Sequence, residues 1–152
     1  MTINIASITD AIVSHAAALG HFERVNLFEP KRNDAGSGMV AAVWLQRLGP
    51  TRSSGLASTT IRLEFVVRIY TPMFAEPQDM IDPAVLAAVD ALMGAYSGDF
   101  TLGGVVRNVD LLGQHGTALS AIAGYLERGG ALFRVMDVTL PLIINDTWDQ
   151  EA

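Results

Sequence analysis

The sequence predicts an α+β fold: a single domain over residues 1–152, with a largely antiparallel sheet, two main helices and the element order α-β-β-β-α-β-β-β. Three observations lead to this prediction. Alternate residues are apolar over 61–69, which is the period of a strand with one buried face. Apolar residues recur at helical spacing over 83–97, and the pair Gly129-Gly130 separates two later apolar runs as a tight turn would.

The first half of the chain is expected to form one helix and three strands. The segment Ser7-Ile8-Thr9-Asp10 has a hydroxyl cap with an acid three residues on, and apolar residues follow it at helical spacing, so a helix is expected over 7–19. Strands are expected over 24–29, 39–48 and 59–70.

Two polar connections, near 31–38 and 50–58, separate these strands. Each is expected either to be an ordinary mobile surface loop or to be mobile in the free chain and ordered against a partner. The second connection predicts a protruding hairpin between the strands that it joins.

The second half begins with the stronger helical signal. Asp82 and Pro83 predict a cap and a first-turn proline for a helix over 83–97, and Gly98 is placed to end it. The helices are expected to lie on the faces of the sheet. Three further strands are expected over 105–111, about 122–127 and 132–144.

The composition indicates a chain with little surface charge. Hydrophobic residues make up 50% of the sequence and charged residues 17%, against roughly 25% charged residues in typical globular proteins. An assembling subunit would have such a composition, because neighbours cover part of its surface. The longest unbroken apolar run, 39–45, is too short for a membrane helix, and the absence of cysteine excludes disulfides and thiolate metal sites.

The charge is divided unevenly along the chain. Residues 1–76 carry 7 basic and 6 acidic groups, whereas residues 77–152 carry 3 basic and 10 acidic groups. Because phosphates attract basic surfaces, this division argues against nucleic-acid binding by the second half.

The residues that could carry chemistry lack the spacing that chemistry needs. His15 and His21 are expected to be exposed histidines on and just after the first helix. His115 lies in the turn GQHG and could act as a base only if an acid met it in space. A small hydrolase would need a convergent polar pocket around His115, Asp110 or Asp99, and no catalytic, cofactor-binding or metal-binding residue is assigned.

Three stretches in the last two thirds of the chain carry a family resemblance. They are RIYTPMFAEPQDMIDPAVLAAVDALMGAYSGDF (68–100), GGVVRNVDLLGQHGTALSAIAGYL (103–126) and FRVMDVTLPLIINDTWDQ (133–150). From Leu56 onward the sequence resembles the tail terminator, or tail completion, proteins of long-tailed bacteriophages, especially those infecting actinobacteria. It is more distantly similar to the tail terminator of phage lambda.

The resemblance implies a structural virion protein with no catalytic residues and no cofactor. Such proteins form a ring, expected here to hold six copies, at the head-proximal end of the tail tube. The ring stops tube polymerisation and offers a surface for head–tail joining. The implied partners are copies of the chain itself, the major tail tube protein and a head-side neck protein, in the tail of a virion assembled in the host cytoplasm. Genomic DNA would pass through the lumen without sequence-specific binding, and no membrane is involved.

Two alternatives remain open: another neck component, such as a head–tail joining or head completion protein, and more remotely a small hydrolase. Arginine and tyrosine are favoured at protein–protein contacts, and a tryptophan near the C-terminus needs a surface to dock on, its own domain's or a neighbour's. The residues expected at a subunit or tail-tube contact are Lys31, Arg32, Arg52, Arg62, Glu64, Arg68, Tyr70 and Trp148.

Overall fold

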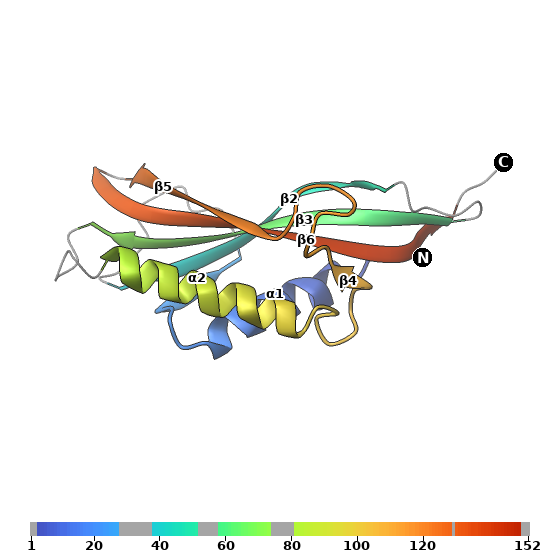
Figure 1. The fold of residues 1–152 in the computed structure, drawn as a ribbon, viewed down its shortest axis with the longest axis horizontal. Helices are drawn as coiled ribbons and strands as arrows, with labels where there is room; N and C mark the ends of the chain where they lie inside the picture. Colours follow the sequence, from blue (N-terminus) through green and yellow to red (C-terminus); the bar gives the residue numbers. More distant parts are fainter. Residues whose placement is uncertain (1–2, 28–37, 52–57, 74–80, 129, 150–152) are drawn as a thin grey trace.

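The structure is a computed structural model, and it describes residues 3–27, 38–51, 58–73, 81–128 and 130–149. These residues form two helices and six strands in the predicted order α-β-β-β-α-β-β-β, which confirms the predicted α+β class (Figure 1). The elements are α1 (Ile5–Ala18), β1 (Arg24–Asn26), β2 (Val40–Pro50), β3 (Ser58–Pro72), α2 (Ile81–Gly98), β4 (Asn108–Val109), β5 (Ser120–Arg128) and β6 (Ala131–Asp149).

The strands form one largely antiparallel sheet in the order β1-β2-β3-β6-β4, and β5 also pairs with β6. Strand β6 pairs with β3 along one side, and on its other side it pairs first with β5 and then with β4. Only the short β1–β2 pair is parallel. In the β5–β6 hairpin Arg128 lies opposite Ala131, which agrees with the predicted tight turn between these strands.

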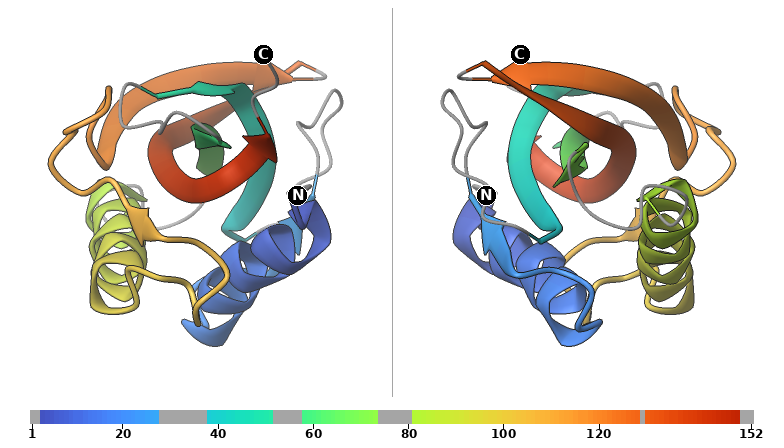
Figure 2. Two further views of the ribbon diagram at one scale, coloured as in Figure 1. Left: turned by 90° about the vertical axis from the view of Figure 1, so that its right-hand side faces the viewer. Right: turned by 90° about the vertical axis from the view of Figure 1, so that its left-hand side faces the viewer.

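Both helices lie on the same face of the sheet, which differs from the prediction of helices on its faces. Figure 2 shows the sheet curling above the helices, with β2 on the side of α1 and β5 on the side of α2. The main core fills the space between helices and sheet, and its members include Ile12, Leu92 and Leu63, each with no exposed surface. The opposite face needs no helix, because the curl of the sheet itself shelters part of it.

Strand β3 is buried on both faces, whereas the alternation in its sequence predicts one buried face. Every residue from Thr60 to Val67 is buried. Leu63 and Phe65 face the helices, while a second, smaller cluster around Tyr70 and Phe133 packs on the opposite face. A strand in the middle of a curled sheet loses solvent on both sides, and a period-two pattern cannot reveal this.

Both helices begin before the predicted start. The cap of α1 is Asn4, whose side-chain oxygen accepts a hydrogen bond from the Ser7 amide at 3.2 Å, so Ser7 lies inside the first turn. Helix α2 begins at Ile81, which makes Asp82 a first-turn residue and not a cap. The carboxylate of Asp82 instead accepts a hydrogen bond from Arg134 Nε on β6, at 2.9 Å.

The strand predicted over 105–111 is only Asn108–Val109, because the preceding residues form turns. The turn in which Leu102, Gly103 and Gly104 adopt positive φ angles continues through Val105, and the chain bends at 106–107, so pairing with β6 begins only at Asn108. The connections predicted near 31–38 and 50–58 lie mostly outside the described residues.

Two polar contacts join the helices. The Tyr96 hydroxyl donates a 3.0 Å hydrogen bond to the Ile12 carbonyl, and burial raises the pKa of Tyr96 far above its usual range, so that the donor stays neutral. Next to it, His15 Nε2 lies 2.8 Å from Asp99 Oδ2. His15 is therefore a half-buried contact residue and not the exposed histidine expected from the sequence.

The Asp99 carboxylate also accepts a hydrogen bond from the Gly103 amide at 3.1 Å. This backbone hydrogen bond, followed by the one to His15, lowers the pKa of Asp99. The carboxylate thus ties the end of α2 both to α1 and to the turn that follows.

Replacing Tyr96 by Phe is expected to lower the free energy of unfolding by about 1 kcal/mol, because a buried hydrogen bond between the helices is lost. Urea denaturation measures the change. Tyr125→Phe is the matched control: its ring is 61% exposed, and the same substitution there should change the free energy by less than about 0.5 kcal/mol. Equal losses for the two variants would contradict the assigned role of Tyr96.

Asp99→Asn is expected to lower stability near neutral pH but not in strong acid. The pKa of Asp99 is lower in the folded chain than its unfolded value of about 3.9, so the ionised carboxylate favours folding above that pH. Its contribution is lost as the pH falls through the folded pKa. Urea denaturation across the acid range should show that the difference in free energy of unfolding between wild type and Asp99→Asn becomes smaller below about pH 4.

The control is Asp90→Asn, which removes one exposed carboxylate from helix α2 and reports the effect of net charge alone. If the loss in free energy of unfolding caused by Asp99→Asn is the same at neutral and at acid pH, the prediction is contradicted.

Candidate assembly surface

The face of the sheet opposite the helices is hollowed into an open trough between β2 and β5, with a volume of about 550 Å³. Its floor comes from the middle of β3 and β6, and its walls come from the two outer strands. The lining residues are Trp44, Leu45, Gln46, Val66, Arg68, Ile122, Asp137 and Thr139. The volume is sufficient for several side chains of a protein partner.

Arg68 organises the floor of the trough. Its guanidinium donates two hydrogen bonds to Asp137, from Nε at 2.7 Å and from Nη2 at 3.0 Å. The same group lies over the Trp44 ring, with Cζ 5.1 Å from the ring centroid. A bidentate pair on an aromatic plane fixes the orientation of the arginine, so the trough floor has a defined shape.

A small apolar cluster packs next to Trp44 of the trough. The Tyr70 ring meets the Phe133 ring edge-on at a centroid distance of 5.8 Å, and Val135 packs beside them. Only 4% of the Tyr70 surface is exposed. Tyr70 therefore supports the trough from inside.

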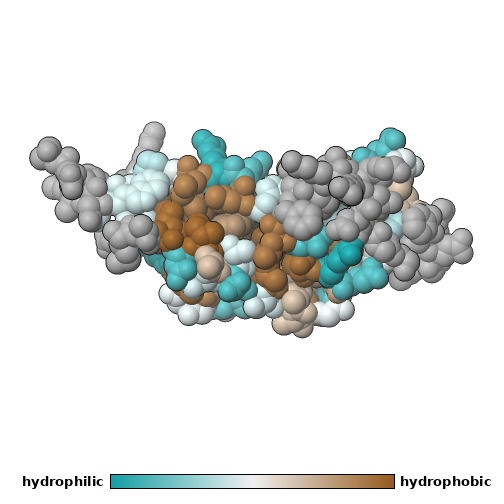
Figure 3. Space-filling model, turned by 180° about the vertical axis from the view of Figure 1, so that it is seen from behind, coloured by the Kyte–Doolittle hydropathy of each residue, from teal (hydrophilic) through white to brown (hydrophobic). Residues whose placement is uncertain are grey.

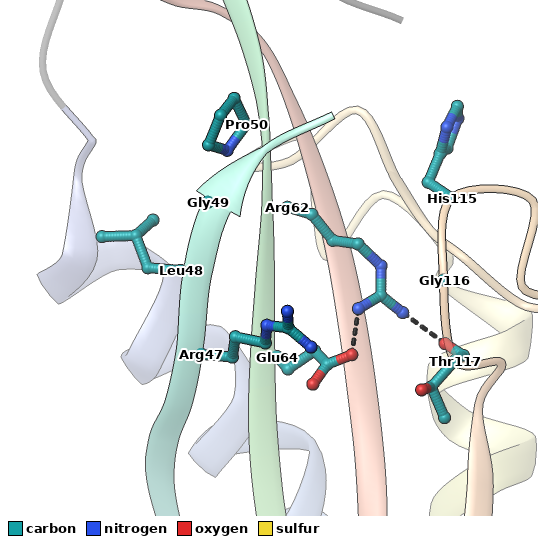
Figure 4. Close-up of a pocket in the computed structure, with 9 residues that line it drawn as sticks. All are labelled: Arg47, Leu48, Gly49, Pro50, Arg62, Glu64, His115, Gly116 and Thr117. Atoms are coloured by element: carbon teal, nitrogen blue, oxygen red, sulfur yellow. Dashed lines mark hydrogen bonds and ion pairs between the residues drawn. The ribbon is translucent and has the colours of Figure 1, made fainter. Parts of the chain in front are cut away.

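Toward the other end of β3, Arg62 is buried under residues 110–117 (Figure 4). Its guanidinium donates to the Glu64 carboxylate through Nη1 and to the Thr117 carbonyl through Nη2, and its Nε lies 3.7 Å from Asp110 Oδ2. These four residues, Arg62, Glu64, Asp110 and Thr117, are called the Arg62 cluster below. Their charged side chains have at most 11% of their surface exposed.

Asp110 shapes the covering segment from within. Its two carboxylate oxygens accept hydrogen bonds from the backbone amides of Gln114, at 2.8 Å, and His115, at 3.0 Å. Gly116 leaves room for the guanidinium, because a Cβ there would lie 2.8 Å from Arg62 Cζ and the arginine would have to shift. The GQHG turn is thus folded around the arginine.

This arrangement holds a loop in place and does not align a base with an acid. The Asp110 carboxylate accepts a hydrogen bond from the backbone amide of His115, whereas the His115 ring points away from Glu64 in Figure 4. Asp99, another residue around which a hydrolase pocket could have formed, lies with His15 at the helices. Among the described residues, no group of three or more histidine, aspartate or glutamate side chains could hold a metal ion.

The predicted contact residues lie in three kinds of place. Arg62, Glu64 and Tyr70 are covered by their own chain, while Arg68 keeps 15% of its side-chain surface at the trough. Trp148 lies in β6 opposite Thr59 and is 38% exposed, although its sequence suggested no strand for it. Lys31, Arg32 and Arg52 lie outside the described residues. Their role at a subunit or tube contact stays a prediction for all of them.

Sequence reasoning missed Asp137 and the exposed apolar residues around the sheet. Asp137 stands in the middle of the apolar run 132–144, and an acid at such a position is the signal that a cross-strand cation faces it. Ile122 on β5 and Leu86 on α2 are 73% and 60% exposed. Figure 3 shows apolar residues gathered in the middle of the face turned away from the viewer in Figure 1.

Neither described helix has the length and apolar character that crossing a bilayer requires.

No protein-family model matches the sequence, and no curated protein matches it. Among solved structures, the chain is similar to one from the sheath/tube terminator of an extracellular contractile injection system, PVC, in its extended state. The TM-score is 0.49 at 12% identity, and the match covers 100% of this chain and 60% of that one, so this chain spans 60% of that protein's length.

The chain is also similar to one from the virion of a native gene transfer agent particle. The TM-score is 0.38 at 12% identity, over 91% of this chain and 95% of that one. Because both TM-scores lie below 0.5, neither likeness carries an argument about this chain.

Arg62→Met is expected to lower the free energy of unfolding by about 3–5 kcal/mol, because it leaves two buried carboxylates without their cation. Chemical denaturation measures the loss. Arg107→Met is the control: the Arg107 side chain is exposed and donates a hydrogen bond to Asn145 Oδ1 at 3.1 Å, so its loss should cost less than about 1 kcal/mol. A comparable loss for both variants would contradict the role given to the Arg62 cluster.

Proposed function

We propose that this chain is a structural subunit of a bacteriophage tail, a tail terminator that assembles with copies of itself into a ring. The ring, expected to hold six copies, would cap the head-proximal end of the tail tube, stop its polymerisation and present a surface to the head-side neck protein. The observation that carries this proposal is the sequence resemblance over 68–100, 103–126 and 133–150.

The surface of the structure supports an assembling subunit. Large apolar side chains are exposed on β2, β5 and α2, where a chain that worked alone would place polar ones. The trough and the strands beside it stand on the face that no helix covers (Figure 2). A cyclic ring joins one patch to a different patch on the next copy, so both sides of such a subunit need contact surface.

Two of the predicted contact residues are accessible enough to meet a partner directly. Arg68 lies on the floor of the trough and Trp148 near the end of β6. Arg62, Glu64 and Tyr70 would contribute indirectly, since they lie buried in β3, which forms part of the trough floor. Lys31, Arg32 and Arg52 would contribute from the polar connections near 31–38 and 50–58.

The net charge suits a ring through which DNA passes. Six copies, each with a formal net charge of −6, would carry −36. A negative lumen would repel the phosphate backbone, which would let the duplex slide without sequence-specific binding. This part of the proposal requires that acidic residues of the second half line the lumen.

The purified chain is expected to form rings when it is offered tail tubes, and to keep them from growing. Mass photometry would give the number of copies, and electron microscopy of tubes grown with and without the chain would compare their lengths. Tubes grown without it should be longer and variable. A chain that stays monomeric in the presence of tube ends would contradict the proposal.

The same experiment distinguishes a tail terminator from the alternative, another neck component. Another neck component, such as a head completion protein, would bind DNA-filled heads and leave tube length unchanged.

A further inference from the structure

Strand β5 presents an open edge. Among the described residues it pairs only with β6, in an uninterrupted register from Ser120 to Arg128. Natural edge strands are blunted by lysine, proline, bulges or shortness, because unpaired backbone groups attract other strands. Strand β5 has nine residues, no lysine, no proline and no register shift. One of its carbonyls, that of Gly124, already accepts a hydrogen bond from Arg134.

Strand β2 presents a second open edge on the other side of the sheet. Strand β1 pairs only with Val40 to Ala42, so that from Val43 to Pro50 no described strand lies on that side of β2. This stretch is almost as long as β5. This edge is less regular than that of β5, because the register with β3 shifts between Leu45 and Arg47 and the strand ends at Pro50. Figure 2 shows β2 rising from beside α1 and β5 from beside α2, and the two strands border the same trough on the face opposite the helices.

The strand directions make the two edges compatible. The pairs β2–β3, β3–β6 and β6–β5 are all antiparallel, so β5 and β2 run in opposite directions. A second copy placed beside the first without being flipped would therefore bring its β2 next to β5 in antiparallel orientation. That is the arrangement already used by these three pairs within the chain.

The side chains of the two edges are also compatible. Leu48 on β2 stands opposite Leu63 of β3, hence on the helix side of the sheet, and it is 45% exposed. On β5, Tyr125 stands opposite Arg134, which bonds α2, so that Tyr125 also lies on the helix side. Continuing the sheet would thus bring apolar groups of both copies together on one face.

Each of the two edges carries an exposed charged residue. Exposed Glu127 lies on β5 and exposed Arg47 lies on β2, and neither forms an ion pair within the described part of the chain.

We infer that the β5 edge of one copy pairs antiparallel with the β2 edge of the next, so that one sheet continues from subunit to subunit. The inference rests on the proposed function, in which copies of the chain assemble, and it names the surfaces that join them. Because the two edges differ, the contact is head to tail, as ring closure requires. The occupant of each edge is a second copy of this chain.

Disulfide cross-linking tests the contact directly, because the chain contains no cysteine of its own. Two double variants pair Tyr125→Cys on β5 with Leu45→Cys or Leu48→Cys on β2. Facing strands bring Cα atoms to about 4.5–5.5 Å, within the range that a disulfide spans. After mild oxidation of the assembled rings, at least one variant should give a ladder of covalent oligomers on a non-reducing gel.

The control pairs Tyr125→Cys with Leu112→Cys, which is 86% exposed but lies in a turn away from both edges. It should remain mostly monomeric on the gel.

Lysine substitution tests the same edges without cross-linking. Ile122→Lys and Leu48→Lys place a charge on each exposed edge and should reduce the fraction of assembled chain at least tenfold, while Leu112→Lys should leave it unchanged. Thermal unfolding of each variant shows whether it is folded.

Rings that form normally, without cross-links in either edge pair and without sensitivity to the edge lysines, would overturn the sheet continuation and leave the proposed function standing. A chain that never assembles, with or without tail tubes, would overturn both.

Discussion

The burial of β3 on both faces is the constraint on which the rest of the structure depends. The helices cover one face, and the curl of the sheet with residues 110–117 covers the other. A charged residue in such a strand cannot remain hydrated, so Arg62 must find its partners inside the protein. It finds them in Glu64, Asp110 and the Thr117 carbonyl, and this requirement fixes the path of a segment that has no regular secondary structure. Arg68, nearer the open part of the trough, meets the same requirement with Asp137.

The arrangement of helices decides which surfaces remain for other molecules. Because α1 and α2 lie on one face, the sheet can offer only its trough and its two outer strands to a partner. Those parts carry the exposed apolar side chains of β2 and β5, together with a floor held rigid by the Arg68–Asp137 pair. The shortage of charge in the sequence and the exposed apolar groups in the structure both indicate a surface with few polar side chains. A surface of this kind suits a subunit that is covered after assembly.

The sequence predicted the positions of helices and strands better than the contacts that their residues make. Helical spacing and strand alternation located both helices and five of the strands, although β6 runs five residues beyond its predicted end. Strand β4 was overestimated because the apolar residues Val105 and Val106, which suggested a strand, belong to the turn and bend that precede it. Asn4 was missed as a cap since Ser7 offered a more familiar pattern. The candidate surface was only partly predictable. Arg62 and Arg68 were recognised as unusual, but their partners Asp110 and Asp137 are 48 and 69 positions away, and only the sheet register reveals such pairs. A single sequence also could not show which edges of the sheet remain open.

The pairing of β3 with β6 has a consequence for synthesis in the host. Partners in this ladder are separated by 61 positions at Pro72–Phe133 and by 91 at Ser58–Asp149. The β2–β3 and β5–β6 hairpins connect near neighbours, so each can form soon after its own residues leave the ribosome. The ladder that joins the hairpins must wait for almost the whole chain, and pairing of such high contact order is slow. During that delay β3 exposes an apolar edge in a crowded cytoplasm, where other nascent copies carry the same one. Translation speed and chaperone capture therefore become part of how much of this protein reaches its native state.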